Sequence, residues 1–166
     1  MRRRTVTLDQ IPEEDLQGIG RVAAAWSELE NQVERIVWRL AGMDDNRGAS
    51  VTTHMSIKAR LDAACALAEL LFPDSEQEKR LRKLAKRTSG TVYGKRNEIV
   101  HSRLASFPDL PGGITVRLTT KARGTLKKQP IPTVDSEYDS VTNEILDLAS
   151  EFQKALADFI GMIAVK

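Results

Sequence analysis

Cysteine, histidine and aromatic side chains are scarce in this chain. Its 166 residues include one cysteine, Cys65, and two histidines, His54 and His101, and aromatic residues make up 5%. A lone cysteine excludes a disulfide framework and suits a cytoplasmic protein. Because Cys65 lies in an apolar helical pattern, we interpret it as a buried thiol rather than a nucleophile. The histidines stand far apart and no HExxH or CxxC spacing occurs, so the sequence predicts no metal site.

Long hydrophobic runs and nucleotide-binding glycine motifs are absent as well. No run approaches roughly 18 consecutive apolar residues, which excludes a transmembrane helix and argues against a membrane partner. Three arginines follow Met1 with no apolar segment behind them, which is not the pattern of a signal peptide. The chain has no Gly-x-x-x-x-Gly-Lys-Ser/Thr loop, no Gly-x-Gly-x-x-Gly after a strand and no Gly-x-Ser-x-Gly. We therefore expect no cofactor and no α/β-hydrolase site.

The dominant pattern in the chain is helical periodicity. An apolar fraction of 41% and a charged fraction of 29% are typical of one globular domain, residues 1–166, that can bury a core. Apolar residues recur at three- and four-residue steps, which predicts helices over residues 12–41, 56–71 and 135–163. The capping box Ser75-x-x-Glu78 opens a further helix.

Two segments and two tryptophans complete the helical prediction. Residues 1–11 are interpreted as a tail, and Met43–Thr53 as a polar connection. Trp26 falls on the apolar stripe of its helix and is expected in the core. Trp38 falls off that stripe, where it would pack on another helix or on a partner chain.

Two glycines leave alternatives open for the helix that begins after Ser75. Gly90 and Gly94 could divide it in two. If the helix continues, both glycines share a stripe with Asn97 and His101, and they would admit another backbone or a ligand there. We favour the continuous helix, at a cost of about 1 kcal/mol per glycine relative to alanine.

A region of different character lies between residues 107 and 134. Phe107–Gly113 is rich in proline and glycine and is expected to be a loop. Ile114–Thr120 alternates apolar and polar residues as a strand does, and Lys121–Gly124 is typical of a turn. A second strand is expected within residues 125–134, at a sheet edge because of its prolines. The sequence thus predicts an all-α protein, a four- to five-helix up-down bundle with a small β-hairpin inserted before the last helix.

Charge is nearly balanced in number but not in distribution. The chain has 25 Lys and Arg against 23 Asp and Glu, a net charge of +2, yet Glu98 is the only acid between Lys79 and Arg103. A solvated helix face is one interpretation of this run, and binding to a polyanion is the other. The candidates for RNA contact are Lys83, Lys86, Arg87, Lys95 and Arg103. The hairpin would extend this surface, or only aid solubility, through Arg117, Lys121, Arg123, Lys127 and Lys128.

Arg96, Asn97 and His101 form the combination with catalytic chemistry. RNA carries its own nucleophile, the 2′-hydroxyl, so cleavage needs a proton acceptor and a fixed cation. An imidazole, with an ordinary pKa of about 6.5, can accept the proton, and a guanidinium can stabilise the phosphate charge. The Asn97 amide can orient the imidazole or bind phosphate. On one helix Arg96 and His101 would point about 140° apart, whereas two copies side by side could share a site, which hints at a dimer.

The run Arg96-Asn97-Glu98-Ile99-Val100-His101 resembles the R-x4-H motif of HEPN domains, in the form with a polar residue after the arginine. HEPN domains are all-helical bundles, and many are metal-independent ribonucleases that work as homodimers with paired motifs at the interface. The resemblance implies that Arg96, Asn97 and His101 are catalytic, without a metal, and that RNA and a second copy are partners. Ser102 departs from the glycine that follows the histidine in many members.

The resemblance is compatible with two kinds of function. The first is a metal-independent endoribonuclease acting as a homodimer. It would be a defence nuclease or the toxin of a toxin–antitoxin pair, with an antitoxin protein as partner. The second is a non-catalytic HEPN-like module that dimerises or binds a partner. Such modules usually lose the motif, which this chain keeps, and cleavage of RNA in the presence of EDTA would separate the two.

Overall fold

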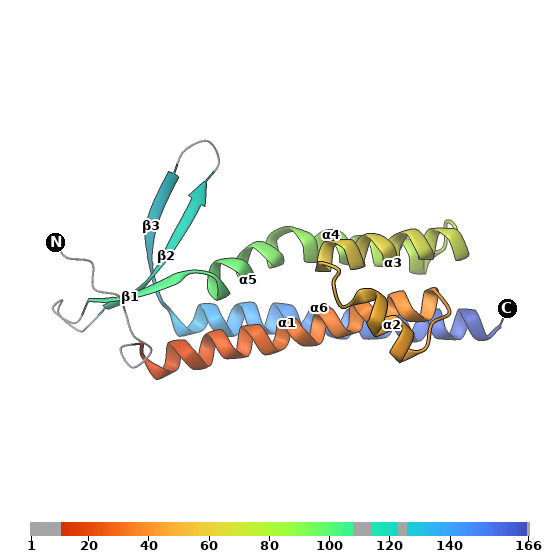
Figure 1. Cartoon of the computed structure of the whole chain (residues 1–166), viewed down its shortest axis with the longest axis horizontal. Coiled ribbons are helices and arrows are strands. Elements are labelled where there is room, and N and C mark those ends of the chain that lie inside the picture. The colour runs from red at the N-terminus through yellow and green to blue at the C-terminus, as the bar shows by residue number, and fades with distance from the viewer. Residues whose placement is uncertain (1–10, 108–113, 123–125, 166) are drawn as a thin grey trace.

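The computed structural model describes residues 11–107, 114–122 and 126–165 of the chain (Figure 1). The tail at residues 1–10 and the predicted loop and turn at 108–113 and 123–125 lie outside the described residues. Helices dominate, which confirms the all-α class. The helices are α1 (Glu13–Leu40), α2 (Asp45–Thr52), α3 (Ile57–Leu71), α4 (Glu76–Arg87), a π-helical turn (Thr88–Val92), α5 (Tyr93–Val100) and α6 (Asp135–Ala164). The strands are β1 (Arg103–Phe107), β2 (Ile114–Ala122) and β3 (Leu126–Pro132).

Polar side chains begin three of the helices. The Asp44 carboxylate accepts hydrogen bonds from the first backbone N–H groups of α2, and the Ser56 hydroxyl accepts one at the start of α3. The Ser75 hydroxyl accepts from the backbone N–H of Glu78 at 3.1 Å, which is the serine half of the predicted capping box. The caps at Ser56 and Ser75 set the starts of α3 and α4 close to the positions that the sequence predicts.

The two longest helices, α1 and α6, lie side by side and run in the same direction (Figure 1). Their first turns meet, because Tyr138 Oη donates to Asp15 Oδ1 at 2.9 Å and Arg21 pairs with Asp139 at 3.0 Å. Helix α3 runs the same way, and α4 and α5 run against it. The order is therefore not the simple up-down alternation that we predicted, because the segment containing α2 returns the chain before α3 begins.

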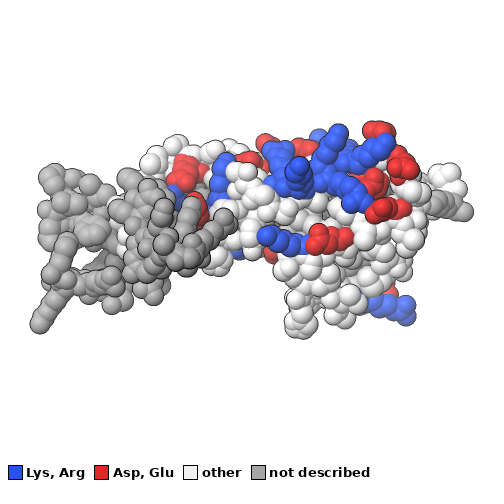
Figure 2. Space-filling view, turned by 90° about the horizontal axis from the view of Figure 1, so that it is seen from above, with Lys and Arg blue, Asp and Glu red and all other residues white. Residues whose placement is uncertain are grey.

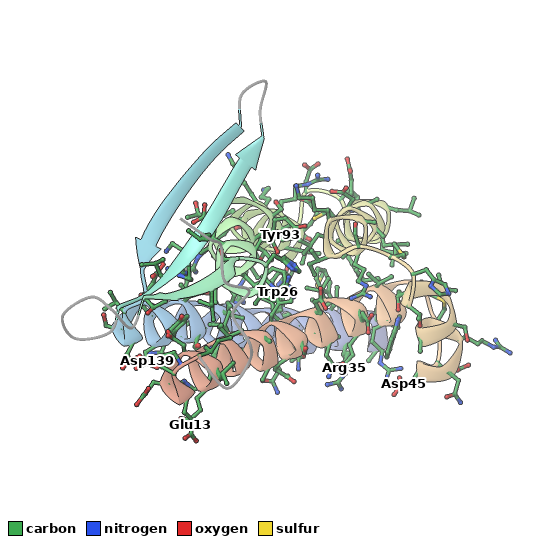
Figure 3. All side chains as sticks on the ribbon, turned by 60° about the vertical axis from the view of Figure 1, so that its left-hand side comes forward. Glu13, Trp26, Arg35, Asp45, Tyr93 and Asp139 are labelled. Atoms are coloured by element: carbon green, nitrogen blue, oxygen red, sulfur yellow. The ribbon has the colours of Figure 1, made fainter. Side chains whose placement is uncertain are left out.

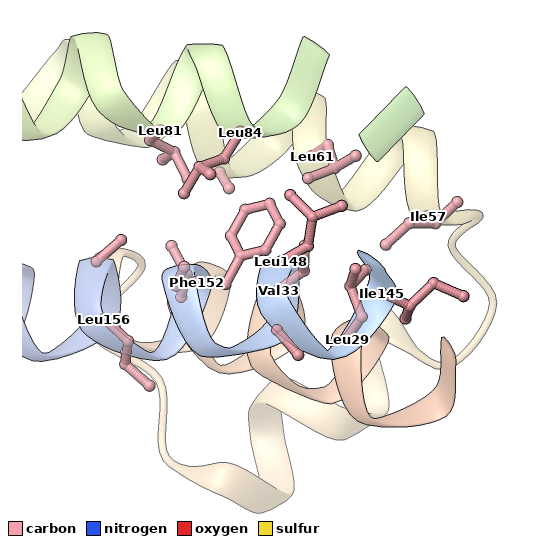
Figure 4. Close-up of a cluster of buried hydrophobic side chains, with 14 of the residues drawn as sticks. Leu29, Val33, Ile57, Leu61, Leu81, Leu84, Ile145, Leu148, Phe152 and Leu156 are labelled. Atoms are coloured by element: carbon pink, nitrogen blue, oxygen red, sulfur yellow. The ribbon is translucent and has the colours of Figure 1, made fainter. Parts of the chain in front are cut away.

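The core lies between α1 and α6 on one side and α3 and α4 on the other (Figure 4). Leu29 and Val33 of α1 and Phe152 of α6 are fully buried there. Trp26 is 2% exposed, which confirms its predicted place in the core. Cys65 is partly buried, and burial raises the pKa of its thiol, which keeps it protonated. Within the described residues, no helix has the length and apolar character needed to cross a membrane.

Helix α2 corrects one prediction and decides between the two alternatives for Trp38. The segment predicted as an irregular connection contains an eight-residue helix. This helix covers Trp38, whose ring nitrogen donates to Thr52 Oγ1 at 3.1 Å, so the ring packs within its own chain. Gly48 of α2 lies directly over the indole, where a Cβ would clash with the ring. Trp38 thus packs on another helix of its own chain, which is the first of the two alternatives that the sequence left open.

The segment after α4 bends at Gly90. The backbone there has φ −91° and ψ −113°, outside the helical region, within a π-helical turn that joins α4 to α5. The continuous helix that we favoured is therefore wrong at this residue. A Cβ built on Gly90 or Gly94 would meet no described atom within 4 Å, so in this chain neither glycine makes room for a close contact. The bend aims α5 away from the axis of α4 (Figure 1).

The three strands form an antiparallel sheet in the order β1-β2-β3, with Arg103 opposite Leu118 and Val116 opposite Pro132. Arg117 of β2 is 1% exposed and pairs with Glu137 at the start of α6. Arg117 therefore does not extend a basic surface, because it anchors the sheet to the bundle. The other basic side chains assigned to this region lie outside the described side chains, namely Lys121, Arg123, Lys127 and Lys128.

Replacing Tyr138 with phenylalanine should destabilise the fold by about 1–3 kcal/mol at neutral pH, because buried Asp15 then loses a hydrogen-bond donor. Burial raises the pKa of Tyr138, and the bond to Asp15 raises it further. Above about pH 10 the unfolded chain releases the phenolic proton while the folded parent keeps it. The free energy of unfolding of the parent then falls by up to about 1.4 kcal/mol per pH unit, and the variant does not share this loss.

Denaturant unfolding of parent and Tyr138→Phe, from about pH 7 to about pH 11, measures this difference in stability. We expect the difference to be largest below about pH 10 and to narrow above it. A difference that stays constant or widens above that pH would contradict the buried hydrogen bond.

Candidate functional site

His101 lies at the exposed end of α5, where the helix stops. The helix ends at Val100, and His101 takes φ −105° and ψ 0° as its cap, with its backbone N–H bonded to Asn97 O at 3.0 Å. The Arg96 Nη1 atom lies 3.1 Å from His101 Nε2 and 3.0 Å from Asn97 Oδ1. The three candidate catalytic residues are therefore in contact within one chain.

This contact removes the geometric reason for a shared site. The expected separation of about 140° between Arg96 and His101 holds only if both are inside one helix. His101 is outside it, so the two side chains meet without a second copy. The predicted dimer consequently loses its support from helix geometry and retains only the implication of the resemblance.

The Arg96 guanidinium rests on the indole ring of Trp26 from α1. Its Cζ atom lies 5.4 Å from the ring, within cation–π distance. The indole is fixed in turn, because its Nε1 donates to Glu30 Oε1 at 2.9 Å and its ring packs against Tyr93 with 5.9 Å between centroids. Figure 3 shows Trp26 and Tyr93 next to each other between α1 and α5. The arginine is thus held by a rigid aromatic surface rather than by a flexible loop.

The contact with Arg96 determines how His101 can act. A guanidinium always donates hydrogen bonds, so Nε2 of His101 must accept and carries no proton in this arrangement. The tautomer that fits this contact carries its proton on Nδ1 and has its lone pair on Nε2. Its lone pair is occupied by Arg96 until an anion, such as a phosphate, draws the guanidinium away. Asn97 contacts Arg96 through its amide, so it orients the cation.

Ser102 occupies the position where many HEPN domains have glycine. Its hydroxyl donates back to the backbone carbonyl of Glu98, in the last turn of α5. The serine thereby satisfies one of the carbonyls that a helix end leaves without a partner.

The predicted RNA-contact residues divide into two groups. Arg87 pairs with Glu151 at 3.3 Å and Lys95 with Glu144 at 2.9 Å, so the acidic face of α6 offsets both charges. Lys83 and Lys86 are exposed and form no ion pair with any residue in the described ranges. Figure 2 shows Lys and Arg side chains gathered on one face, interleaved with Asp and Glu. The side chain of Arg103, in β1, is outside the described side chains.

Sequence reasoning missed the support beneath Arg96. Trp26 was assigned to the core alone, and Lys58 to no role. Lys58 Nζ lies 5.1 Å from the centroid of the Tyr93 ring, so it continues the series of cations and rings. These residues come from α1, α3 and α5, and no local motif links them. Of the described residues, no three His, Cys, Asp or Glu side chains are grouped as a metal site would require.

Removing the guanidinium should change the tautomer of His101. In Arg96→Ala, Nε2 no longer accepts a hydrogen bond, so the neutral ring should shift toward the Nε2–H form that a free imidazole prefers. Nitrogen-15 spectra of the imidazole rings, recorded near pH 9 where histidine is neutral, report this shift. His54 is exposed and lies elsewhere, and its signals serve as the internal control. An unchanged His101 tautomer would contradict the contact.

Comparison with known proteins identifies no relative: no family model, curated protein or solved structure matches the chain. The functional interpretation therefore depends on the geometry of Arg96, Asn97 and His101.

Proposed function

We propose that this chain is a metal-independent endoribonuclease with His101 as its general base. The supporting observation is the 3.1 Å contact between Arg96 Nη1 and His101 Nε2 at an exposed helix end. It joins a proton acceptor to a permanent cation, the two groups that cleavage through the RNA 2′-hydroxyl requires. The resemblance of residues 96–101 to the HEPN motif supports the same chemistry.

The proposed reaction begins when the scissile phosphate accepts hydrogen bonds from Arg96. The guanidinium then leaves Nε2 of His101, which takes the proton of the 2′-hydroxyl. The 2′-oxygen forms a bond to phosphorus and the bond from phosphorus to the 5′-oxygen breaks. Arg96 stabilises the negative charge that develops on the phosphate oxygens. The proton that His101 has taken passes to the 5′-oxygen, so the products are a 2′,3′-cyclic phosphate and a 5′-hydroxyl.

A homodimer belongs to this proposal through the resemblance to HEPN domains. Because each chain carries a complete set of Arg96, Asn97 and His101, a second chain would add contacts to the RNA rather than a missing catalytic group. The same resemblance suggests a toxin with an antitoxin partner, or a defence nuclease, as the biological setting. The alternative is a HEPN-like module that binds a partner without cleaving RNA.

Purified protein should cut single-stranded RNA in the presence of EDTA and leave DNA intact, because DNA lacks the 2′-hydroxyl. His101→Ala should lower the rate about 10²–10⁴-fold through loss of the general base. Arg96→Ala should lower it about 10²–10³-fold through loss of charge stabilisation. The measurement is the rate of cleavage of labelled RNA, with mass spectrometry of the fragments to detect the 2′,3′-cyclic phosphate.

His54→Ala is the matched control, since it removes the other histidine, which is exposed, and should cut at the parental rate. Circular dichroism spectra should agree among the variants, which shows that each is folded. If folded parent leaves RNA intact, the ribonuclease proposal is wrong. Binding of RNA or of a protein partner without cleavage would favour the alternative module.

Mixing the two inactive variants tests whether one chain supplies the whole site. Arg96→Ala and His101→Ala should remain inactive after they are mixed, denatured together and refolded, because no chain then holds both groups. A site shared between chains would instead regain activity in the mixed dimers. Recovery of a substantial fraction of the parental rate would therefore contradict a site within one chain.

A further inference from the structure

A recess lies between the start of α3 and the end of α4, next to the bend at Gly90. It has a volume of about 350 Å³. Its lining consists of Lys58, Leu61, Asp62, Ala85, Lys86 and Ser89. We refer to it below as the lysine pocket, because two of these six residues are lysines from different helices.

The charges around the lysine pocket favour an anion. Lys58 and Lys86 form no ion pair with any residue that the structure describes, whereas Arg82 and Arg87 on the same face of the molecule are paired. Asp62 is the one carboxylate in the lining. The Ser89 hydroxyl donates to Ala85 O at 2.9 Å, so its proton is already in use. The donors available to a bound group are therefore the two ammonium groups.

A continuous series of contacts joins the lysine pocket to His101. Lys58 lies over Tyr93 at 5.1 Å, Tyr93 packs on Trp26 at 5.9 Å, and Arg96 lies 5.4 Å from the Trp26 ring. Trp26 is 2% exposed, so no base can stack on it. The two rings instead lie between the Lys58 ammonium and the guanidinium of Arg96.

Cations at two places on one protein can each bind a phosphate of the same nucleic-acid strand. We propose that the lysine pocket binds a second phosphate of the RNA strand that is cleaved. The inference rests on the proposed ribonuclease function and makes it more specific. The substrate is then a single strand longer than a dinucleotide, held at Arg96 and at the lysine pocket together.

The test measures binding separately from cleavage. Oligouridylates with 2′-O-methyl groups cannot be cleaved through the 2′-oxygen, so their affinity can be followed by fluorescence anisotropy with the intact protein. For the hexamer, Lys58→Gln and Lys86→Gln should each weaken binding. Each should also reduce the slope of log affinity against log salt by about 0.7, the value for one phosphate contact on a single strand. For the dimer, which is too short to reach the pocket, both variants should bind like the parent.

Lys154→Gln is the matched control. Lys154 lies on α6, is exposed and has no ion pair with a described residue, and it does not line the pocket. It should keep the parental slope. If Lys154→Gln loses as much as Lys86→Gln, or if the two pocket variants keep the parental slope while RNA is still cut, the lysine pocket is not a subsite and the proposed function stands. If the parent neither binds the hexamer nor cuts RNA, both proposals fail.

Discussion

The parallel packing of α1 against α6 determines where every other element lies. Both helices carry an apolar stripe along their length, and burying the two stripes together removes the largest apolar surface of the chain from water. Their first turns are locked by the buried Asp15–Tyr138 hydrogen bond, beside which Gly18 leaves room for the tyrosine ring. Helices α3 and α4 then close the remaining apolar faces of this pair. The packing of α1 against α6 also orients Trp26, and the Trp26 ring supports Arg96 in the candidate site.

Trp26 belongs to the core and to the candidate site at once. Its buried face contributes to the packing of α1, and its ring supports the Arg96 guanidinium. A cation that lies on a packed ring has few alternative positions, so its hydrogen bonds to Asn97 and His101 need little further ordering. His101 caps the C-terminal end of α5, where its exposed imidazole lies 3.1 Å from Arg96 Nη1.

The amino-acid sequence was sufficient for much of the helical pattern. Periodic apolar residues and the serine caps located α1, α3, α4 and α6 closely, because these signals are local and strong. It was insufficient for α2, whose eight residues have a weak apolar pattern and are stabilised by covering Trp38. It was also insufficient for the bend at Gly90, where the continuous helix that we favoured is wrong, since a glycine permits either geometry. Contacts between residues far apart in the chain, such as Trp26 with Arg96, carry no local signal at all.

The pairing of charged side chains shows most clearly that contacts between distant residues cannot be predicted from the sequence. A count along the sequence makes Arg87, Lys95 and Lys86 equivalent, because each belongs to one basic run. In the fold, α4 and α5 run against α6, so Arg87 and Lys95 meet acidic partners while Lys86 meets none in the described part of the chain. An arginine or lysine that already has a carboxylate partner must give up that pair to bind a phosphate. After the tertiary pairing with α6, the cations of this run that have no carboxylate partner among the described residues are Lys83, Lys86 and Arg96.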